Sequence, residues 1–273
     1  MIGIAYSRSD PASLGAAKIV LEELRCRATG KDLYRCEELD VYVIGMDVDV
    51  VYMDDLEKFS SVVDTFVVLS RHSSASRIPI LSVHTPGNPG PEARYGGKPW
   101  ELAFSNPVLG WLILRELARL RDEEKLEDVD VVYEATHHGP TSISKPVTFA
   151  EIGSSEDRWN DPRMHRVLAT AVLEAIRRYL AGGETCIETV GFGGPHYEKI
   201  FTSRALKYGE CYGHIIAKYV LNDLDGAGLE RVARLAIERT LNARKVVLEK
   251  LRSDARKVIR KVAEELGLEV ETL

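Results

Sequence analysis

The chain has 273 residues, of which 45% are hydrophobic and 29% are charged, a balance typical of a globular protein with a sizeable core. Its net charge of −6 at pH 7 argues against a surface that binds nucleic acid non-specifically over its whole extent. The N-terminus has no basic segment followed by an apolar run, and no stretch approaches the roughly 18 to 20 apolar residues of a membrane helix, so we expect neither secretion nor membrane insertion.

The four cysteines are scattered along the chain, at Cys26, Cys36, Cys186 and Cys211, without a CxxC or CxxxC pair. This distribution signals neither a disulfide framework nor a thiolate zinc site. We therefore expect free thiols in a reducing cytoplasm. Cys186 and Cys211 are interpreted as small buried apolar side chains rather than as nucleophiles.

Short apolar runs alternate with helical patterns in the first two thirds of the chain. Residues 2–6 predict a buried strand, and a helix with Pro11 in its first turn follows. Further β-branched runs predict strands at 41–45, 64–69, 79–84, 129–133, 146–152 and 186–191, and Asn-Pro and Asp-Pro open predicted helices at 106–120 and 161–181. This alternation predicts a three-layer α/β/α fold around a mostly parallel sheet.

The segment at 84–99 is rich in Gly and Pro and too long for a simple connection, so we interpret it as a functional loop rather than a mobile lid. After residues 224–228, apolar side chains at a seven-residue spacing predict a long helix, with a possible break at Ser253 and an end at Gly267. We expect one domain over 1–273, with 228–266 as a basic helical segment packed on it.

That C-terminal segment is strongly basic. From Arg231 to Lys261, eleven Lys or Arg residues stand against three acidic residues. Such side chains can bind the phosphates of a nucleic acid, and Arg252, Arg256 and Arg260 are our candidates for such contacts. A solvated helix face explains the same pattern at least as well.

His and Glu residues follow three of the predicted strands. His84 ends the strand at 79–84, Glu134, His137 and His138 come after the strand at 129–133, and His196 comes after the strand at 186–191. In open parallel sheets, ligands bind beyond the carboxyl ends of the strands, so we expect these side chains to share one crevice. A single loop histidine is more often a surface or hydrogen-bonded residue, but four of the seven histidines at strand ends favour a site.

Neutral imidazoles and carboxylates are the ligand set of catalytic zinc, although the spacing EATHH is not the HExxH of a metalloprotease helix. A zinc ion lowers the pKa of its bound water to about 7, which suits hydrolysis of an ester. We expect three histidines to bind the metal and three other residues to transfer protons: His84, His138 and His196, and Glu134, His137 and Glu151.

Several further residues have both a functional and a structural interpretation. Asn88, Gly193 and Gly194 in glycine-rich loops could bind substrate or an oxyanion, or could only form turns. His214, at a predicted helix start, could support the site or cap the helix, and His72 and His165 are interpreted as structural or surface residues. There is no dinucleotide fingerprint, P-loop or GxSxG elbow in the chain.

Five motifs in order, HTPGNPG (84–90), EATHHGP (134–140), FAEIGSSEDRW (149–159), GFGGPHYEK (191–199) and GECYGHI (209–215), resemble those of the archaeal and plant type of D-aminoacyl-tRNA deacylase. The resemblance begins at YSRSDPAS (6–13) and covers nearly the whole chain. It implies a phosphorylase/hydrolase-like fold similar to peptidyl-tRNA hydrolase, dependence on zinc, and hydrolysis of the ester bond of D-aminoacyl-tRNA.

The candidate residues His84, Glu134, His137, His138, Glu151 and His196 all match positions in these motifs, but the resemblance does not divide them between zinc binding and proton transfer. It implies aminoacylated tRNA as the partner, a D-amino acid as the released group, and a cytoplasmic protein. We expect a monomer. A metal-dependent amidase or peptidase, a non-enzymatic RNA-binding protein and a nucleoside phosphorylase are the alternatives.

Overall fold

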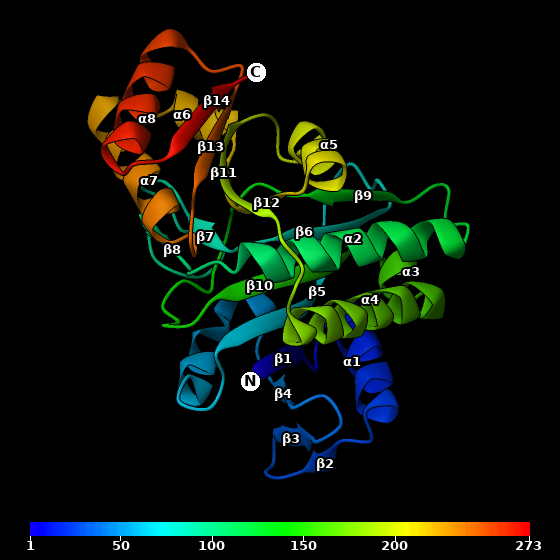
Figure 1. Ribbon diagram of the computed structural model, residues 1–273. Helices are drawn as coiled ribbons and strands as arrows, with labels where there is room; N and C mark the ends of the chain where they lie inside the picture. Colours follow the sequence, from blue (N-terminus) through cyan, green and yellow to red (C-terminus); the bar gives the residue numbers. More distant parts are fainter.

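The computed structural model describes residues 1–273 (Figure 1). Its elements, in chain order, are β1 (Ile2–Ser7), α1 (Pro11–Glu23), β2 (Arg27–Ala28), β3 (Leu33–Cys36), β4 (Val41–Met46), the 3-10 helix η1 (Val50–Phe59), β5 (Thr65–Ser73), β6 (Ile80–His84), β7 (Gly87–Asn88), β8 (Glu101–Leu102), α2 (Pro107–Glu123), β9 (Asp130–Tyr133), β10 (Val147–Ser154), α3 (Glu156–Trp159), α4 (Pro162–Ala181), β11 (Ile187–Gly193), α5 (Lys199–Tyr208), β12 (Glu210–Ile216), α6 (Lys218–Asn222), α7 (Gly226–Glu238), β13 (Lys245–Glu249), α8 (Ser253–Glu265) and β14 (Glu269–Thr272).

A large sheet with the strand order β2-β3-β4-β1-β5-β10-β6-β9 forms the centre of the molecule. Its strands β4, β1, β5 and β10 are parallel, whereas β6 and β9 run parallel to each other and antiparallel to β10. All seven strands predicted from the sequence are present, six of them in this sheet. The predicted α/β class with a mostly parallel, mixed sheet is therefore confirmed.

The three long helices α1, α2 and α4 lie side by side on one face of the large sheet (Figure 1). Each begins with Pro in its first turn, after Asp10, Asn106 or Asp161, whose side chain accepts a hydrogen bond from a backbone N–H of that turn. Their apolar stripes and the sheet bury a core of 43 residues. No helix of the structure is both long and apolar enough to cross a membrane.

The opposite face of the large sheet is covered by η1 and by loop segments rather than by long helices. Met53 and Leu56 of η1 pack in a smaller apolar core that also contains Phe66, Val68 and Phe149 of the sheet. Because side chains alternate along a strand, the residues that continue this face on β5, β10 and β6 are polar: Ser70, His72, Glu151, Ser82 and His84.

A second sheet, in the order β12-β11-β13-β14, has all its strands parallel and is covered by α7 and α8. The predicted long C-terminal helix is therefore wrong, because β13 separates α7 from α8. The reason is the run KVVLE, whose five residues are all buried between neighbouring strands, so that the apolar spacing read as helical was partly that of a strand. Gly267, with a φ of 77°, follows the end of α8 as expected.

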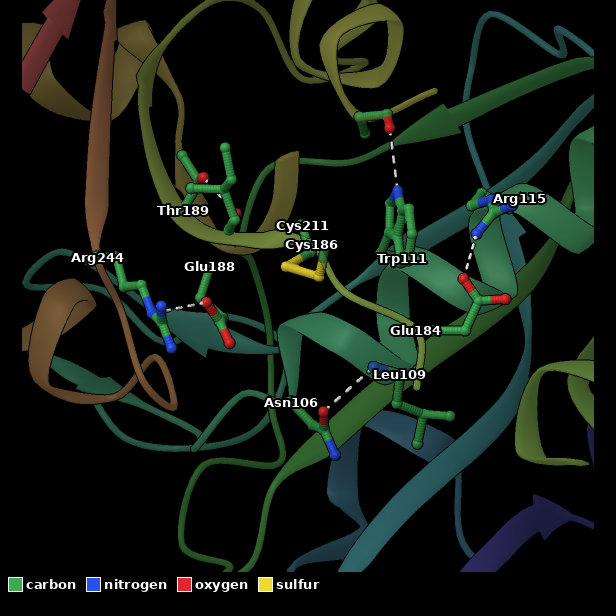
Figure 2. The surroundings of a disulfide bond; sticks show 12 residues. Asn106, Leu109, Trp111, Arg115, Glu184, Cys186, Glu188, Thr189, Cys211 and Arg244 are labelled. Atoms are coloured by element: carbon green, nitrogen blue, oxygen red, sulfur yellow. Dashed lines mark hydrogen bonds and ion pairs between the residues drawn. A yellow bond between two sulfur atoms is a disulfide. The ribbon is translucent and has the colours of Figure 1, made fainter. Parts of the chain in front are cut away.

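The prediction of free cysteines is also wrong. Cys26 is bonded to Cys36, and Cys186 to Cys211. Figure 2 shows the second disulfide beside Trp111 of α2 and the ion pair of Arg115 with Glu184. Cys186 and Cys211 meet because β11 and β12 pair in parallel with Ile187 opposite Glu210, a contact between strands that spacing along the chain does not reveal.

Candidate active site

Five histidines and two glutamates gather on the η1 side of the large sheet, next to the second sheet. Three of them project from strands: His72 from β5, Glu151 from β10 and His84 from the end of β6. The others follow strand ends: Glu134, His137 and His138 after β9, and His196 after β11. The expected convergence is confirmed, but β6 is antiparallel to β10, so the site lies over a face of the sheet and not beyond one edge.

Backbone hydrogen bonds between the two sheets bring His196 to this place. The N–H of Ala135 donates to the carbonyl of His196, and the N–H of Glu198 donates to the carbonyl of Tyr133. The segment after β9 therefore continues as an irregular bridge to the segment after β11. This bridge sets the His196 ring beside the carboxylate of Glu134.

One part of the site, which we call the imidazole group, consists of His84, His137 and His138. One nitrogen from each ring lies within 4.8 Å of those of the other two. The Nδ1 atoms of His137 and His138 are 2.8 and 2.6 Å from the backbone carbonyl oxygens of Ala135 and Gly139. A carbonyl oxygen only accepts, so each Nδ1 carries the proton and each Nε2 keeps its lone pair free.

His84 stands out within this group. Its ring stacks on Phe149 at a centroid distance of 5.1 Å, and both ring nitrogens are buried without a hydrogen-bond partner. Burial, together with the neighbouring imidazoles, also lowers the pKa of His137 well below its usual range and that of His138 to about 4. These two rings are therefore neutral at pH 7, which is the form that binds a metal.

The other part, the carboxylate group, consists of Glu134, Glu151, His72 and His196. His196 Nε2 lies 2.9 Å from Glu134 Oε2, and His72 Nδ1 lies 3.2 Å from Glu134 Oε1 and 3.3 Å from Glu151 Oε2. The second ring nitrogen of each histidine contacts a tyrosine hydroxyl. That of Tyr197 is 2.9 Å from His72 Nε2, and that of Tyr219 is 3.4 Å from His196 Nδ1.

In the carboxylate group, the histidine and the two glutamates each stabilise the charged form of the other. Burial alone would lower the pKa of His72, but its contacts with Glu134 and Glu151 outweigh burial and raise that pKa to about 11. Burial would likewise raise the pKa of both carboxyl groups, yet the histidines beside them hold the pKa of Glu134 and of Glu151 well below the usual range. At neutral pH, two carboxylates therefore face one imidazolium.

A cavity of about 500 Å³ opens onto both groups. Its floor contains His72, His137, His138, Glu151 and His196. Its other walls come from η1 with the residue before it, from β5 and from the 84–99 loop, and include Asp49, Val50, Val51, Tyr52, Ser70, Arg71, Ser73 and Tyr95. A small ester could thus approach imidazoles and carboxylates at the same time.

The imidazole group meets the requirements of a zinc site in its donor chemistry. It offers nitrogen donors from three imidazoles, two of them neutral and oriented by carbonyl oxygens. The buried nitrogens of His84 make no hydrogen bond within the protein, and its Nε2 lies 3.6 Å from Glu151 Oε1. His72, Glu134 and His196 form a second set with ligand atoms within 4.8 Å of one another. In that set, a metal would have to displace the proton of His72.

His72 is not a surface residue, because its side chain is buried between the carboxylates of Glu134 and Glu151. A part for His72 in the reaction is a proposal, and the alternative of a purely structural role stays open to test. The position of His72 after a continuous apolar run hides its role in the sequence, where polar residues stand out mainly in the loops that follow strands. The alternation along TFVVLSRHS gave the missing signal: His72 has the same parity as Phe66 and Val68, which face η1.

Other candidates lie outside the cluster. His214 is buried on β12 and not at a helix start, and its ring contacts Thr136 Oγ1 and the carbonyl of Ala103, both at 2.9 Å. Asn88 donates from Nδ2 to the carbonyl of Gly96. Gly193 and Gly194 pack closely against Glu249 and Glu198. None of these four residues lines the cavity.

The basic C-terminal stretch is divided among α7, β13 and α8, and many of its cations already have partners. Arg252 donates to the carbonyl of Asn222, and Arg260 donates to Thr272 Oγ1 and pairs with Glu264. Arg256 is exposed on α8. A contact between this surface and tRNA stays a prediction.

Comparison with known proteins identifies the family of the chain. A family model described as D-aminoacyl-tRNA deacylase matches residues 59–271. The D-aminoacyl-tRNA deacylase of Desulfurococcus amylolyticus is 40% identical over 92% of this chain and 91% of its own length, and that of Hyperthermus butylicus is 39% identical over 99% and 100%. The crystal structure of a conserved protein of unknown function, AF0625, has a TM-score of 0.88 at 30% identity and covers 100% of this chain and 95% of its own. The chain thus belongs to the D-aminoacyl-tRNA deacylase family.

Proposed function

We propose that the protein hydrolyses the ester bond of D-aminoacyl-tRNA, releasing the D-amino acid and the tRNA, with a zinc ion held by His84, His137 and His138. The observation that carries the zinc proposal is the pair of buried ring nitrogens of His84, which have no hydrogen-bond partner although they lie beside two neutral imidazoles. Leaving such groups unpaired costs stability, so a ligand that satisfies them explains why the chain retains them.

A bound zinc ion supplies Lewis acidity, which polarises an ester carbonyl and lowers the pKa of water. Glu151 lines the cavity and is ionised at neutral pH, so it accepts a proton from the attacking water. A chain of contacts then leads from Glu151 through His72 and Glu134 to His196. His196, at the cavity, returns a proton to the ribose oxygen as the acyl C–O bond breaks, so that the proton taken from water ends on the released tRNA.

This division of roles differs in part from the one expected from the sequence. There, His196 was a metal ligand and His137 a proton carrier. The Nε2 of His196 lies 2.9 Å from Glu134, whereas the Nδ1 of His137 is committed to a backbone carbonyl and its ring is held in the neutral state. We therefore propose that His137 binds the metal and that His196 transfers protons.

The test of the reaction is a deacylation assay on matched D- and L-tyrosyl-tRNA, with and without a chelator. We expect the D-ester to be cleaved, the L-ester to persist, and the chelator to abolish cleavage until zinc is restored. Cleavage of both isomers at equal rates would refute the chiral preference. Full activity in the chelated protein would refute the role of zinc.

Zinc content is measured separately by elemental analysis of the purified protein. His84→Ala should lower the zinc content, whereas His165→Gln, a substitution outside the cluster, should leave it unchanged. Equal zinc in the wild type and His84→Ala would exclude the imidazole group as the metal site.

We also propose that the protein is a single-domain monomer in the cytoplasm, where charged tRNA is its substrate. The two disulfides do not oppose this, because intracellular proteins of hyperthermophilic archaea contain disulfides.

For the tRNA surface, Arg256→Glu is a better test than reversal of Arg252 or Arg260, which would also break contacts within the fold. Unchanged affinity for tRNA at moderate salt would exclude α8 from the interface.

A further inference from the structure

Two exposed tyrosines stand at the rim of the cavity that contains the catalytic side chains. Tyr52 belongs to η1 and is 55% exposed, and Tyr95 belongs to the 84–99 loop and is 67% exposed. Both line the same cavity as His137 and His138. The fold therefore places two aromatic rings in solvent, next to the reacting groups, without burying either one.

Close backbone packing holds the two tyrosines at this position. The N–H of Gly139, which follows His138, donates to the carbonyl of Tyr95. A Cβ on Gly96 would lie 1.9 Å from the carbonyl oxygen of Val51, the residue before Tyr52, and a Cβ on Gly139 would meet the backbone of Gly96 and of Val51 within 2.6 Å. Only glycine allows these segments to approach so closely. The tyrosine rim is thus fixed relative to the imidazole group.

Two exposed cations accompany Tyr95 on the same loop. The side chains of Arg94 and Lys98 are 74% and 67% exposed, and they lie 2.7 and 3.9 Å from carboxylate oxygens of Glu92 and Glu101. Exposed ion pairs of this kind are weak, so both cations can turn to a phosphate. Exposed aromatic rings combined with nearby cations are the usual means by which proteins hold unpaired nucleotides, since the rings stack on bases and the cations meet phosphates. In a charged tRNA, the nucleotide that carries the ester is itself unpaired and has its base one ribose away from the reacting carbonyl.

We propose that Tyr52 and Tyr95 form a subsite that stacks on the terminal nucleobase of the acceptor strand and so positions the ester over the imidazole group. This inference rests on the proposed function. The rim recognises a base and not the amino acid, because the amino acid must occupy the enclosed part of the cavity beside Glu151 and His138.

The experiment compares two non-hydrolysable inhibitors of D-tyrosyl-tRNA hydrolysis. One is the 3′-amide of D-tyrosine with 3′-amino-3′-deoxyadenosine, and the other is the same D-tyrosine amide on a ribose without a base. For Tyr52→Ala and Tyr95→Ala, we expect the inhibition constant of the adenosine amide to rise about ten-fold, as for the loss of one base-aromatic stack. The inhibition constant of the base-free amide should not change, and the KM for D-tyrosyl-tRNA should rise more than kcat falls.

Two further sets of variants complete the test. Tyr52→Phe and Tyr95→Phe should keep most of the affinity, because phenylalanine still stacks. Tyr208→Ala removes an equally exposed tyrosine on α5 and should have no effect on either inhibitor. The inference is overturned if the alanine variants weaken both amides alike, which would mean that the rings contact the amino acid or shape the site, or if they weaken neither. A wild-type protein that does not cleave D-tyrosyl-tRNA at all would instead refute the proposed function.

Discussion

Two clusters of buried charged groups in this molecule have their hydrogen bonds satisfied to very different degrees. In the second sheet, Glu210 accepts hydrogen bonds from Arg204 at 2.7 Å, from Lys245 at 3.0 Å and from the hydroxyl of Tyr212 at 2.5 Å, while Glu271 also pairs with both cations. Every carboxylate oxygen of Glu210 is used. We call this set the ion-pair cluster.

The cluster over the large sheet is different. There, both nitrogens of His84 are buried without a hydrogen bond, and three imidazoles face one another with centroids 4.3 to 4.9 Å apart. Unsatisfied buried polar groups lower stability, whereas a complete network of this kind holds the fold together. The polar atoms of the ion-pair cluster already have partners within the protein. The cluster over the large sheet, which we call the histidine cluster, leaves the nitrogens of His84 without a hydrogen bond. Of the two, only the histidine cluster therefore has the properties of a site for a ligand.

The largest expected effect is on catalysis by the histidine cluster. Glu134→Gln and His138→Ala should each lower kcat/KM on D-tyrosyl-tRNA by about 10²- to 10⁴-fold, because one removes a charge from the proton path and the other a nitrogen donor from the metal group. His165→Gln serves as the control, since His165 lies outside the cluster and its ring is hydrogen-bonded to the carbonyl of Trp159. Near-normal turnover in both cluster variants would show that this is not the active site.

His72 tests whether the carboxylate group acts as a unit. His72→Gln removes the imidazolium between Glu134 and Glu151, so we expect kcat/KM to fall about 10²-fold. With less positive charge beside them, the pKa of both carboxyl groups should rise, and the acid limb of the pH profile should move to higher pH. Profiles of kcat/KM against pH for the wild type and the variant measure this. An unmoved acid limb would assign His72 a purely structural role.

The sequence predicted the large sheet and its helices well, because local patterns specify them. Pro after Asp10, Asn106 and Asp161 marked the helix starts, and continuous apolar runs marked the central strands. The strand β13 was missed because a single buried strand of five residues inside a basic, helix-rich stretch has no periodicity of its own. The disulfides were missed because the pairing of β11 with β12 is a tertiary contact.

The same distinction explains the site. His84, Glu134, His137, His138 and His196 could be found from strand ends, since polar residues there stand out against the apolar runs. His72 could not, because its role depends on which face of β5 it occupies and on β10 as its neighbour, and both follow from the order of strands in the sheet. The division of the histidines into an imidazole group and a carboxylate group depends on distances between their side chains, and the spacing of residues along the chain does not give these distances.

For the ion-pair cluster, the comparison predicts an effect on stability and not on catalysis. Glu210→Gln leaves Arg204 and Lys245 buried with one anionic partner fewer, so the free energy of unfolding should fall by about 3 kcal/mol. The matched control is Glu264→Gln, which removes an exposed partner of Arg260 and should cost under about 0.5 kcal/mol. Denaturant unfolding gives both values, and kcat/KM should be unchanged in both variants. A loss of activity in Glu210→Gln well below its melting temperature would contradict the separation of the two clusters.

The smallest expected effect is the pH dependence of the difference in unfolding free energy between the wild type and Glu210→Gln. It tests the charge of Glu210 alone. Burial would raise the pKa of Glu210, but its contacts with Arg204, Tyr212 and Lys245 lower it from 4.5 to about 2. Since the folded protein binds this proton more weakly than the unfolded chain, the stabilisation is complete above pH 4.5 and is lost as the pH falls toward about 2. Unfolding free energies of the wild type and Glu210→Gln should therefore differ by a constant amount between pH 5 and 7 and converge below pH 4.5. A difference that persists unchanged at pH 2.5 would mean that the cluster stabilises the fold through shape and packing, and not through the charge of Glu210.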